Sequence, residues 1–306
     1  MAFGWAALLY GPAALRCTGD FMRRIACWLV SMVLLGAALA GCQGGGDAAV
    51  AKPPKPGPYA LPAADAAYDR GEYELAYIKY LPLAEAGEVR AQIRLGKLLY
   101  EGLGTPKDYA EAARWWRRAA DTGNASAATS LGFLYTQGHG VPQDYAEAAR
   151  WYRMSATLGD DHGQFDLGNA YRNGRGVKQD QAEAAYWYRL AAGQGYAAAQ
   201  FNLGIMYAAG EGVEQSRDEA VNWYRLAANQ GHAAALNNLG WMYWEGEEEF
   251  RDPVKALALL TVAAERGSEH ASLNRANVAA TMTPRERAEA RLLANEWRER
   301  IAAWGG

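Results

Sequence analysis

Residues that could carry acid–base or metal chemistry are few and scattered along this chain of 306 residues. Protein zinc sites need histidine, cysteine or carboxylate ligands at short, characteristic spacings. His139 lies in a glycine-rich loop, whereas His232 and His270 lie near the boundaries of repeated units, and none of these or His162 pairs with another histidine at ligand spacing. We therefore predict surface or turn positions for the histidines, with no metal site and no cofactor.

Catalytic motifs are also missing from the sequence. It contains no Gly-x-Ser-x-Gly elbow, no phosphate-binding loop and no His-Glu-x-x-His pair. The regularly placed carboxylates stand at expected helix starts. One irregular run, Glu247-Glu248-Glu249-Phe250, is either a solvated loop or an acidic contact for a basic partner. The sequence predicts a protein that is not an enzyme.

Charge and cysteine content exclude further classes. The formal net charge is -3 at pH 7, and nucleic-acid binding would favour a basic stripe, so we predict no nucleic-acid partner. The three cysteines are Cys17, Cys27 and Cys42, all close to the N-terminus. No disulfide framework is expected in the remainder of the chain.

One sequence pattern repeats five times between residues 91 and 267 and covers most of the chain's middle and C-terminal part. A Leu-Gly pair recurs every 36 residues, at Leu95-Gly96, Leu131-Gly132, Leu167-Gly168, Leu203-Gly204 and Leu239-Gly240. Trp115, Trp151, Trp187 and Trp223 keep the same step. A fixed period of this size predicts an all-α solenoid of helix–turn–helix units, each burying its aromatic face against the next.

Each unit reads as two helices. In the second unit the first helix is predicted over 126–136, and a Gly-Pro loop ends it before Asp144. Asp144 with Glu147 is a capping-box pattern, in which each side chain bonds the other residue's backbone N–H, and it opens a second helix that buries Trp151 and Tyr152. Equivalent starts recur at Asp108, Asp180, Ser216 and, with a proline following, Asp252.

The glycine of each Leu-Gly pair lies inside a predicted helix, where it costs about 1 kcal/mol relative to alanine. Because five units accept this cost, we expect a neighbouring helix to pass too close for a β-carbon.

The segments Ala199–Tyr207, Gly210–Val213 and Ala220–Arg225 resemble the Sel-one-like repeat (SLR), a relative of the tetratricopeptide repeat. The resemblance covers residues 91 to 267 in five copies. It implies a right-handed α-solenoid, a tetratricopeptide-like superhelix that holds other proteins together and is usually not an enzyme. Some cysteine-rich members bind or hydrolyse β-lactams, but they carry a cysteine pair in each unit, which this chain lacks.

In tetratricopeptide-like superhelices the first helix of each unit lines the concave groove. Carried over by position, the resemblance predicts that partner-binding residues follow each Leu-Gly pair, and that their neighbours three residues on contribute as well. The predicted residues are Lys97, Tyr100, Phe133, Asn169, Arg172, Ile205, Trp241 and Trp244. Phe165 and Phe201 either join this surface or pack between neighbouring helices.

The N-terminus has the order of a secretory signal: Met22-Arg23-Arg24, then an apolar run, then small residues. Leu39-Ala40-Gly41-Cys42 resembles the bacterial lipobox, which implies lipid attachment at Cys42 and removal of residues 1–41. Translation could begin at Met22. The alternative is an N-terminal transmembrane anchor, although the apolar run is marginal for a span. By the sorting preference of some bacterial lipoproteins, the resemblance implies that Gln43 after the lipid site favours the outer over the inner membrane.

The remaining boundaries follow from composition. Residues 42–62 form a Gly-, Ala- and Pro-rich linker, 63–90 a degenerate repeat, 91–268 five SLR repeats, and 269–306 the C-terminal helices. The last helix should bury Ala288, Leu292, Trp297 and Ile301 as a cap, or else serve as a docking helix.

We therefore predict a non-catalytic protein–protein interaction scaffold, anchored by lipid in the periplasm, that binds envelope proteins in its groove. Two alternatives remain open from the sequence. One is an envelope protein that binds or hydrolyses cell-wall fragments or β-lactams, and the other is a toxin-immunity or inhibitor protein.

Overall fold

The computed structural model describes residues 60–246 and 251–304 of the chain. Within these ranges there are fourteen α-helices and no strand, as predicted for an all-α protein. No described helix is both long and apolar enough to span a bilayer. The expected signal, Cys42 and the run Glu247–Phe250 lie outside the described residues.

Ten of the helices form five hairpins, and each of these helices is 13 residues long. The first helices of the units are α4 (Val89–Glu101), α6 (Ala125–Gln137), α8 (Asp161–Asn173), α10 (Ala197–Ala209) and α12 (Ala233–Glu245). The second helices are α5 (Tyr109–Asp121), α7 (Tyr145–Thr157), α9 (Gln181–Gly193), α11 (Arg217–Asn229) and α13 (Pro253–Glu265).

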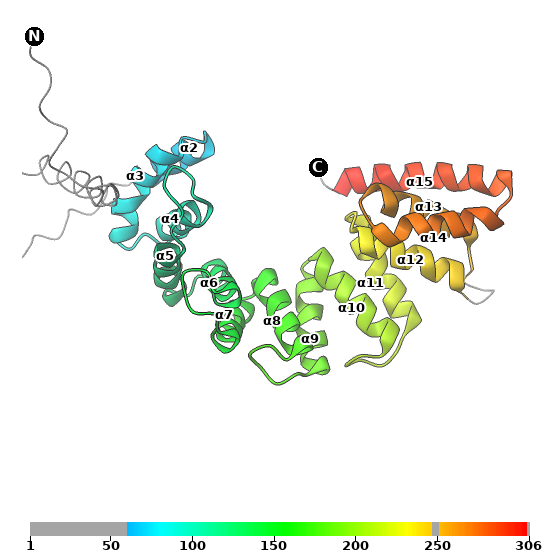
Figure 1. Cartoon of the computed structure of the whole chain (residues 1–306), viewed down its shortest axis with the longest axis horizontal. Helices are drawn as coiled ribbons and strands as arrows, with labels where there is room; N and C mark the ends of the chain where they lie inside the picture. Colours follow the sequence, from blue (N-terminus) through cyan, green and yellow to red (C-terminus); the bar gives the residue numbers. More distant parts are fainter. Residues whose placement is uncertain (1–59, 247–250, 305–306) are drawn as a thin grey trace, which may run out of the picture. The chain divides into compact units, whose positions relative to one another are not determined.

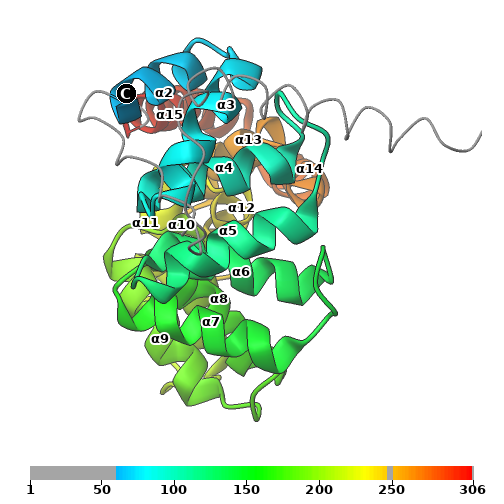
Figure 2. The same cartoon turned by 90° about the vertical axis from the view of Figure 1, so that its left-hand side faces the viewer.

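Neighbouring hairpins pack against each other in sequence order (Figures 1 and 2). Each second helix contacts the first helix of its own unit and the first helix of the next unit, and α6 also contacts α8. Contacts therefore join units that are adjacent in the sequence, which confirms the predicted α-solenoid.

The second helices begin at capped residues, but the capping box is only half formed. The Asp144 carboxylate accepts the N–H groups of Ala146 and Glu147 at 2.8 and 3.1 Å. The reciprocal bond predicted from the Glu147 side chain is replaced, because the Asp144 N–H donates to the Tyr135 carbonyl of α6 at 3.0 Å. The loop thus returns to the helix that it left, and Glu147 pairs with Arg150 instead.

The close approach predicted at the Leu-Gly glycines is confirmed. A β-carbon added to Gly132 would lie 2.7 Å from the Tyr152 ring, and one added to Gly168 would lie 2.8 Å from the Tyr188 ring. The neighbour is an aromatic side chain of the second helix rather than its backbone. In the first four hairpins the glycine therefore makes room for an aromatic ring of the second helix, whereas a β-carbon on Gly240 in the fifth would lie 3.0 Å from the Leu260 side chain.

The tryptophans at the 36-residue step are not buried to the same degree. Trp115 and Trp187 are buried at 5% and 9% exposure, whereas Trp151 and Trp223 are half-buried. The guanidinium of Arg117 lies 6.0 Å from the Trp151 ring. The predicted aromatic seam is therefore complete in two units and partly open in the others.

A further pair, α2 (Ala60–Asp69) and α3 (Tyr73–Glu85), precedes the five hairpins. Its buried residues include Ala64 and Ala67 in α2 and Tyr80 in α3. Helix α2 begins inside the expected linker. Pro62 allows this, because a proline in the first helical turn has no hydrogen bond to lose.

The C-terminal helices are α14 (Glu269–Thr281) and α15 (Pro284–Trp304), and α15 packs against α13 and α11. Trp297 and Ile301 are buried as predicted, but Ala288 is exposed and Leu292 is 66% exposed. Leu292 is five residues from Trp297, which at about 100° per residue turns it away from the buried face. Ala290 and Ala294 take those places and let α15 lie close to its neighbours.

Candidate functional site

The predicted partner-binding residues occupy the ninth and twelfth positions of the 13-residue first helices, from Lys97 and Tyr100 in α4 to Trp241 and Trp244 in α12. Positions three apart share one face of a helix. We call this face, taken over α4, α6, α8, α10 and α12, the first-helix surface.

Two of the predicted residues meet in an aromatic group between the first two units. The rings of Tyr100 and Phe133 lie 6.2 Å apart, edge to face. His139 stacks on Tyr109 with ring centroids 4.7 Å apart and planes 12° apart. Phe133 remains 39% exposed, so a partner can reach it. His139 is thus a loop residue, as predicted, with a packing role.

Phe133 also lines a cavity of about 290 Å³ between α6, α7 and α8, which we call the α6–α8 cavity. Helix α7 provides Tyr145 and Tyr152, and helix α8 provides the predicted residue Asn169 together with Asp166. Its full lining is Phe133, Thr136, Gln137, Tyr145, Ala148, Ala149, Tyr152, Asp166, Asn169, Ala170, Asn173 and Arg175. Two predicted residues from different units therefore face one space.

The α6–α8 cavity contains a half-buried carboxylate. Burial raises the pKa of Asp166 to about 6, against the opposing effects of His162 and of a hydrogen bond from Asn169. At the rim, the guanidinium of Arg175 lies 5.8 Å from the centre of the Tyr145 ring. Among the described residues, no lysine or arginine forms an ion pair with Asp166.

Asn169 and Arg172 are connected through Tyr188 of α9. The Tyr188 hydroxyl donates to Asn169 Oδ1 at 2.7 Å. Burial raises the pKa of Tyr188 to about 12, while the charge of Arg172 works in the opposite direction. Arg172 also reaches Glu211 in the next loop, with an N–O distance of 3.9 Å. These two predicted residues are therefore held in place rather than free to reorient.

The other predicted residues are distributed along the array. Lys97 is exposed and lies 3.8 Å from Glu101 on its own helix. Ile205 and Trp244 are half-buried against the core of the C-terminal units. Trp244 also lies beneath the guanidinium of Arg251, 5.0 Å from the ring centre. Trp241 is half-buried on the same face of α12.

Phe165 and Phe201 have packing neighbours. Phe165 lies 5.0 Å from the Tyr196 ring and 5.7 Å from the Tyr188 ring. Phe201 lies 4.7 Å from the ring of His232. These contacts favour packing over recognition for both residues.

Sequence reasoning missed Asp166, Tyr145, Tyr152 and Arg175 as members of the site. One signal was present, because the sixth position of the first helices also varies between units, although less than the ninth. That position holds Arg94, Ser130, Asp166, Asn202 and Asn238. The contribution of Tyr145 and Arg175 could not be found this way, because they enter from the second helix and from a loop.

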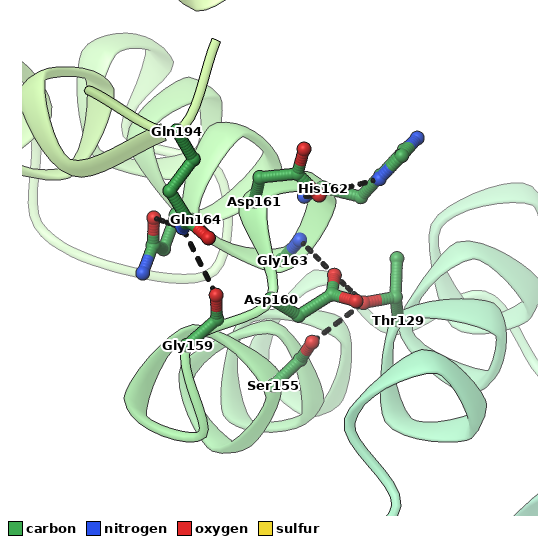
Figure 3. Close-up of polar contacts among 9 residues, drawn as sticks. All are labelled: Thr129, Ser155, Gly159, Asp160, Asp161, His162, Gly163, Gln164 and Gln194. Carbon is green, nitrogen blue, oxygen red and sulfur yellow. Dashed lines mark hydrogen bonds and ion pairs between the residues drawn. The ribbon is translucent and has the colours of Figure 1, made fainter. Parts of the chain in front are cut away.

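A polar network joins the second and third units next to this site (Figure 3). Ser155 is fully buried, and its hydroxyl lies 2.6 Å from the Thr129 hydroxyl, which donates to Asp160 at 3.0 Å. A β-carbon on Gly163 would lie 2.3 Å from Ser155 Oγ. The other units carry alanine at the positions equivalent to 155 and 163. Here the larger Ser155 side chain is matched by the smaller Gly163.

The same junction brings possible metal ligands together. Ligand atoms of Asp160, Asp161 and His162 lie within 4.8 Å of one another. The Asp160 carboxylate already accepts the Gly163 N–H at 2.7 Å and so serves as the helix cap. His162 Nδ1 lies 2.9 Å from Asp161. These contacts explain the cluster as the start of α8, and the absence of a metal remains a prediction.

Comparison with known proteins identifies the repeats. The Sel1 repeat family model matches residues 89–124, 125–160, 161–196, 197–232 and 233–268. No curated protein matches the chain significantly.

Solved structures show the same fold. A Sel1 repeat protein from Oxalobacter formigenes is 30% identical, with a TM-score of 0.67, and the match covers 78% of this chain and 99% of that one. A protective antigen of uropathogenic Escherichia coli with an SLR fold is 29% identical, with a TM-score of 0.51, and the match covers 81% of this chain and 63% of that one. Five consecutive family matches, the 36-residue hairpins and these similar structures show that the chain belongs to the Sel1 repeat family.

Proposed function

We propose that the chain is a non-catalytic scaffold of the bacterial cell envelope that binds protein partners on its first-helix surface. The observation that carries this proposal is the contrast between constant and varied positions. The Leu-Gly pair is the same in all five units, while the residue that follows it is Lys97, Phe133, Asn169, Ile205 or Trp241. Packing requires the constant Leu-Gly pair, and recognition of a particular partner accounts for the variation at the residue that follows it.

An affinity purification of the full chain from native envelopes tests the proposal. Phe133→Ala is expected to lower partner recovery at unchanged helical content. Leu226→Ala is a matched control, because Phe133 and Leu226 are 39% and 41% exposed but Leu226 lies on a second helix. Equal recovery with both variants would count against the first-helix surface.

Variants of Trp241 and Trp244 also test the first-helix surface, but stability must be measured alongside partner binding. Trp244 packs against the core and Arg251, so its removal is expected to destabilise the C-terminal units as well as weaken binding. Trp241→Ala alone is the better probe of partner capture, with thermal unfolding measured on the same sample. If Trp241→Ala unfolds the array, Trp241 belongs to the core and not to the binding surface.

The membrane part of the proposal rests on the sequence alone. The lipobox-like sequence Leu39-Ala40-Gly41-Cys42 supports lipid attachment at Cys42, and Gln43 after it supports a periplasmic protein held at the outer membrane rather than the inner one. Cys42→Ser is expected to abolish labelling with palmitate and release the protein from the membrane fraction. Retained labelling would exclude the lipobox.

Catalysis is the rival class. A screen of cell-wall and β-lactam substrates is expected to show no turnover. Turnover that is abolished by one substitution on the first-helix surface would overturn the scaffold proposal.

A further inference from the structure

We propose that the α6–α8 cavity is a pocket for one cationic side chain, lysine or arginine, projecting from the bound protein partner. This inference rests on the proposed scaffold function and names the chemistry that one part of the first-helix surface recognises. The geometry that supports it is a carboxylate set among aromatic rings in a cavity open to solvent.

The first argument is charge. Asp166 is half-buried in the cavity, and no described lysine or arginine forms an ion pair with it. Withdrawing a carboxylate from water destabilises the fold at neutral pH, and His162 and the hydrogen bond from Asn169 offset this only in part. A cation that enters the cavity relieves this penalty, so the charged group that is unfavourable in the free protein becomes favourable in the complex.

The second argument is the shape and nature of the walls. Phe133, Tyr145 and Tyr152 line the same space as Asp166. Aromatic faces attract ammonium and guanidinium groups, and the methylene chain of a lysine or arginine packs well against them. A volume of about 290 Å³ accommodates one such side chain.

The protein itself shows that one wall accepts a cation. The guanidinium of Arg175 lies 5.8 Å from the centre of the Tyr145 ring at the rim. Arg175 is exposed and forms no ion pair with Asp166 among the described contacts. Because the Arg175 guanidinium would attract an acidic ligand instead, charge-reversed peptides are part of the test.

The experiment uses the full chain in detergent and a displayed library of random short peptides. Peptides that bind the wild-type protein are recovered, and their affinities are measured for wild type and for Asp166→Asn. In each recovered peptide, single lysine or arginine residues are replaced by norleucine, which keeps much of the length and removes the charge. A glutamate replacement is the charge-reversed control.

We expect at least one recovered peptide in which norleucine weakens binding to wild type about tenfold, as for a partly desolvated cation with a carboxylate and aromatic neighbours. The same replacement should weaken binding to Asp166→Asn clearly less than binding to wild type, because the carboxylate is already absent and only the aromatic contribution, about two- to fivefold, remains to be lost. Asp161→Asn is the matched control, since Asp161 is a neighbouring acid of α8 that does not line the cavity. In the Asp161→Asn variant, replacing the peptide's lysine or arginine by norleucine should weaken binding as much as it does in wild type.

The outcomes separate this inference from the scaffold function. Peptides that bind, lose affinity with Phe133→Ala and are indifferent to Asp166→Asn would refute the cation pocket and leave the scaffold standing. An Asp161→Asn effect as large as that of Asp166→Asn would refute it as well, since general negative charge would then explain the preference. Recovery of no binding peptide would contradict both proposals.

Discussion

Glutamines join neighbouring units in the later part of the array and leave a gap in the earlier part. Gln194 Nε2 donates to Gly159 O at 2.9 Å and to Gln164 Oε1 at 2.8 Å. Gln230 repeats this with Gly195 O at 2.8 Å and Gln200 Oε1 at 2.9 Å. We call each such arrangement a glutamine clamp.

The corresponding clamp is missing between the degenerate repeat and the first unit. Gln92 is buried, its Nε2 donates to Ala84 O at 3.1 Å, and its Oε1 has no partner among the described residues. The residue that should complete the clamp is Thr122, whose short side chain bonds Ala119 O at 2.7 Å instead. Thr122→Gln is therefore expected to complete it, with Gly87 O as the second acceptor.

The expected gain follows from opposing terms. Pairing a buried acceptor recovers about 1–3 kcal/mol, and the new bond to Gly87 adds about 0.5–1.5 kcal/mol. Ordering the glutamine opposes this with up to about 2 kcal/mol, and the lost Thr122 bond opposes it with about 1 kcal/mol. The net stabilisation of Thr122→Gln is about 1 kcal/mol.

Leu158→Gln is the control, since position 158 is the equivalent residue of the next unit, in which Ala128 stands at the position of the buried glutamine. It can form only the carbonyl bond, as Arg266 does with Gly231 O at 2.7 Å, and is expected to be near neutral. Repeat arrays can unfold in parts, so urea midpoints should be combined with amide exchange in α3 to α5. Equal effects of the two substitutions, or no gain from Thr122→Gln, would refute the glutamine-clamp reasoning.

Three further predictions concern stability. Gly168→Ala should destabilise the fold by about 1–3 kcal/mol because its β-carbon would meet the Tyr188 ring at 2.8 Å. The control Gly193→Ala, whose β-carbon would have nothing within 4 Å, should stabilise the fold by up to about 1 kcal/mol. Equal urea midpoints for the two variants would contradict this. The raised pKa of Asp166, about 6 against 3.8, means that its ionisation destabilises the fold as pH rises through that range. Asp166→Asn should therefore be more stable by about 1–3 kcal/mol at pH 7, with the difference gone below pH ~4; a difference that persists there would show another cause. Asp252→Ala removes the cap bond to the Lys255 N–H at 2.9 Å and should lower the thermal midpoint by an amount equivalent to about 1 kcal/mol.

The repeat architecture was predictable because the same physical requirement recurs at a fixed step. A Leu-Gly pair, a loop with glycines and a capped start define one hairpin, and five copies remove the ambiguity of any single one. The predicted helix over 126–136 is Ala125–Gln137 in the structure, a difference of one residue at each end.

Other features depended on contacts that a single helix does not reveal. The face of α15 was misassigned at Leu292 because an amphipathic sequence offers more than one apolar stripe, and close packing against α13 favours Ala290 and Ala294. The missing half of the capping box at Asp144 depended on the loop, which brings the carbonyl of Tyr135 to the N–H that Glu147 would have taken.

The candidate site was partly predictable for the same reason. Phe133 and Asn169 follow from position in the repeat, and both line the α6–α8 cavity. Asp166 was visible as a varied position, but its burial beside rings from α7 required the packing of two units. Predictions from a repeat pattern therefore reach the residues of one helix more readily than the pocket formed between helices.

The return of each loop to its own first helix has a consequence for how such a chain can change over generations. The bond from the Asp144 N–H to Tyr135 O, and its counterpart from Asp180 to Tyr171 at 3.0 Å, begin and end inside one unit. Duplicating or losing a whole unit would leave every bond of this kind intact. The number of units, and with it the extent of the first-helix surface, can thus be altered by recombination without redesigning any hairpin.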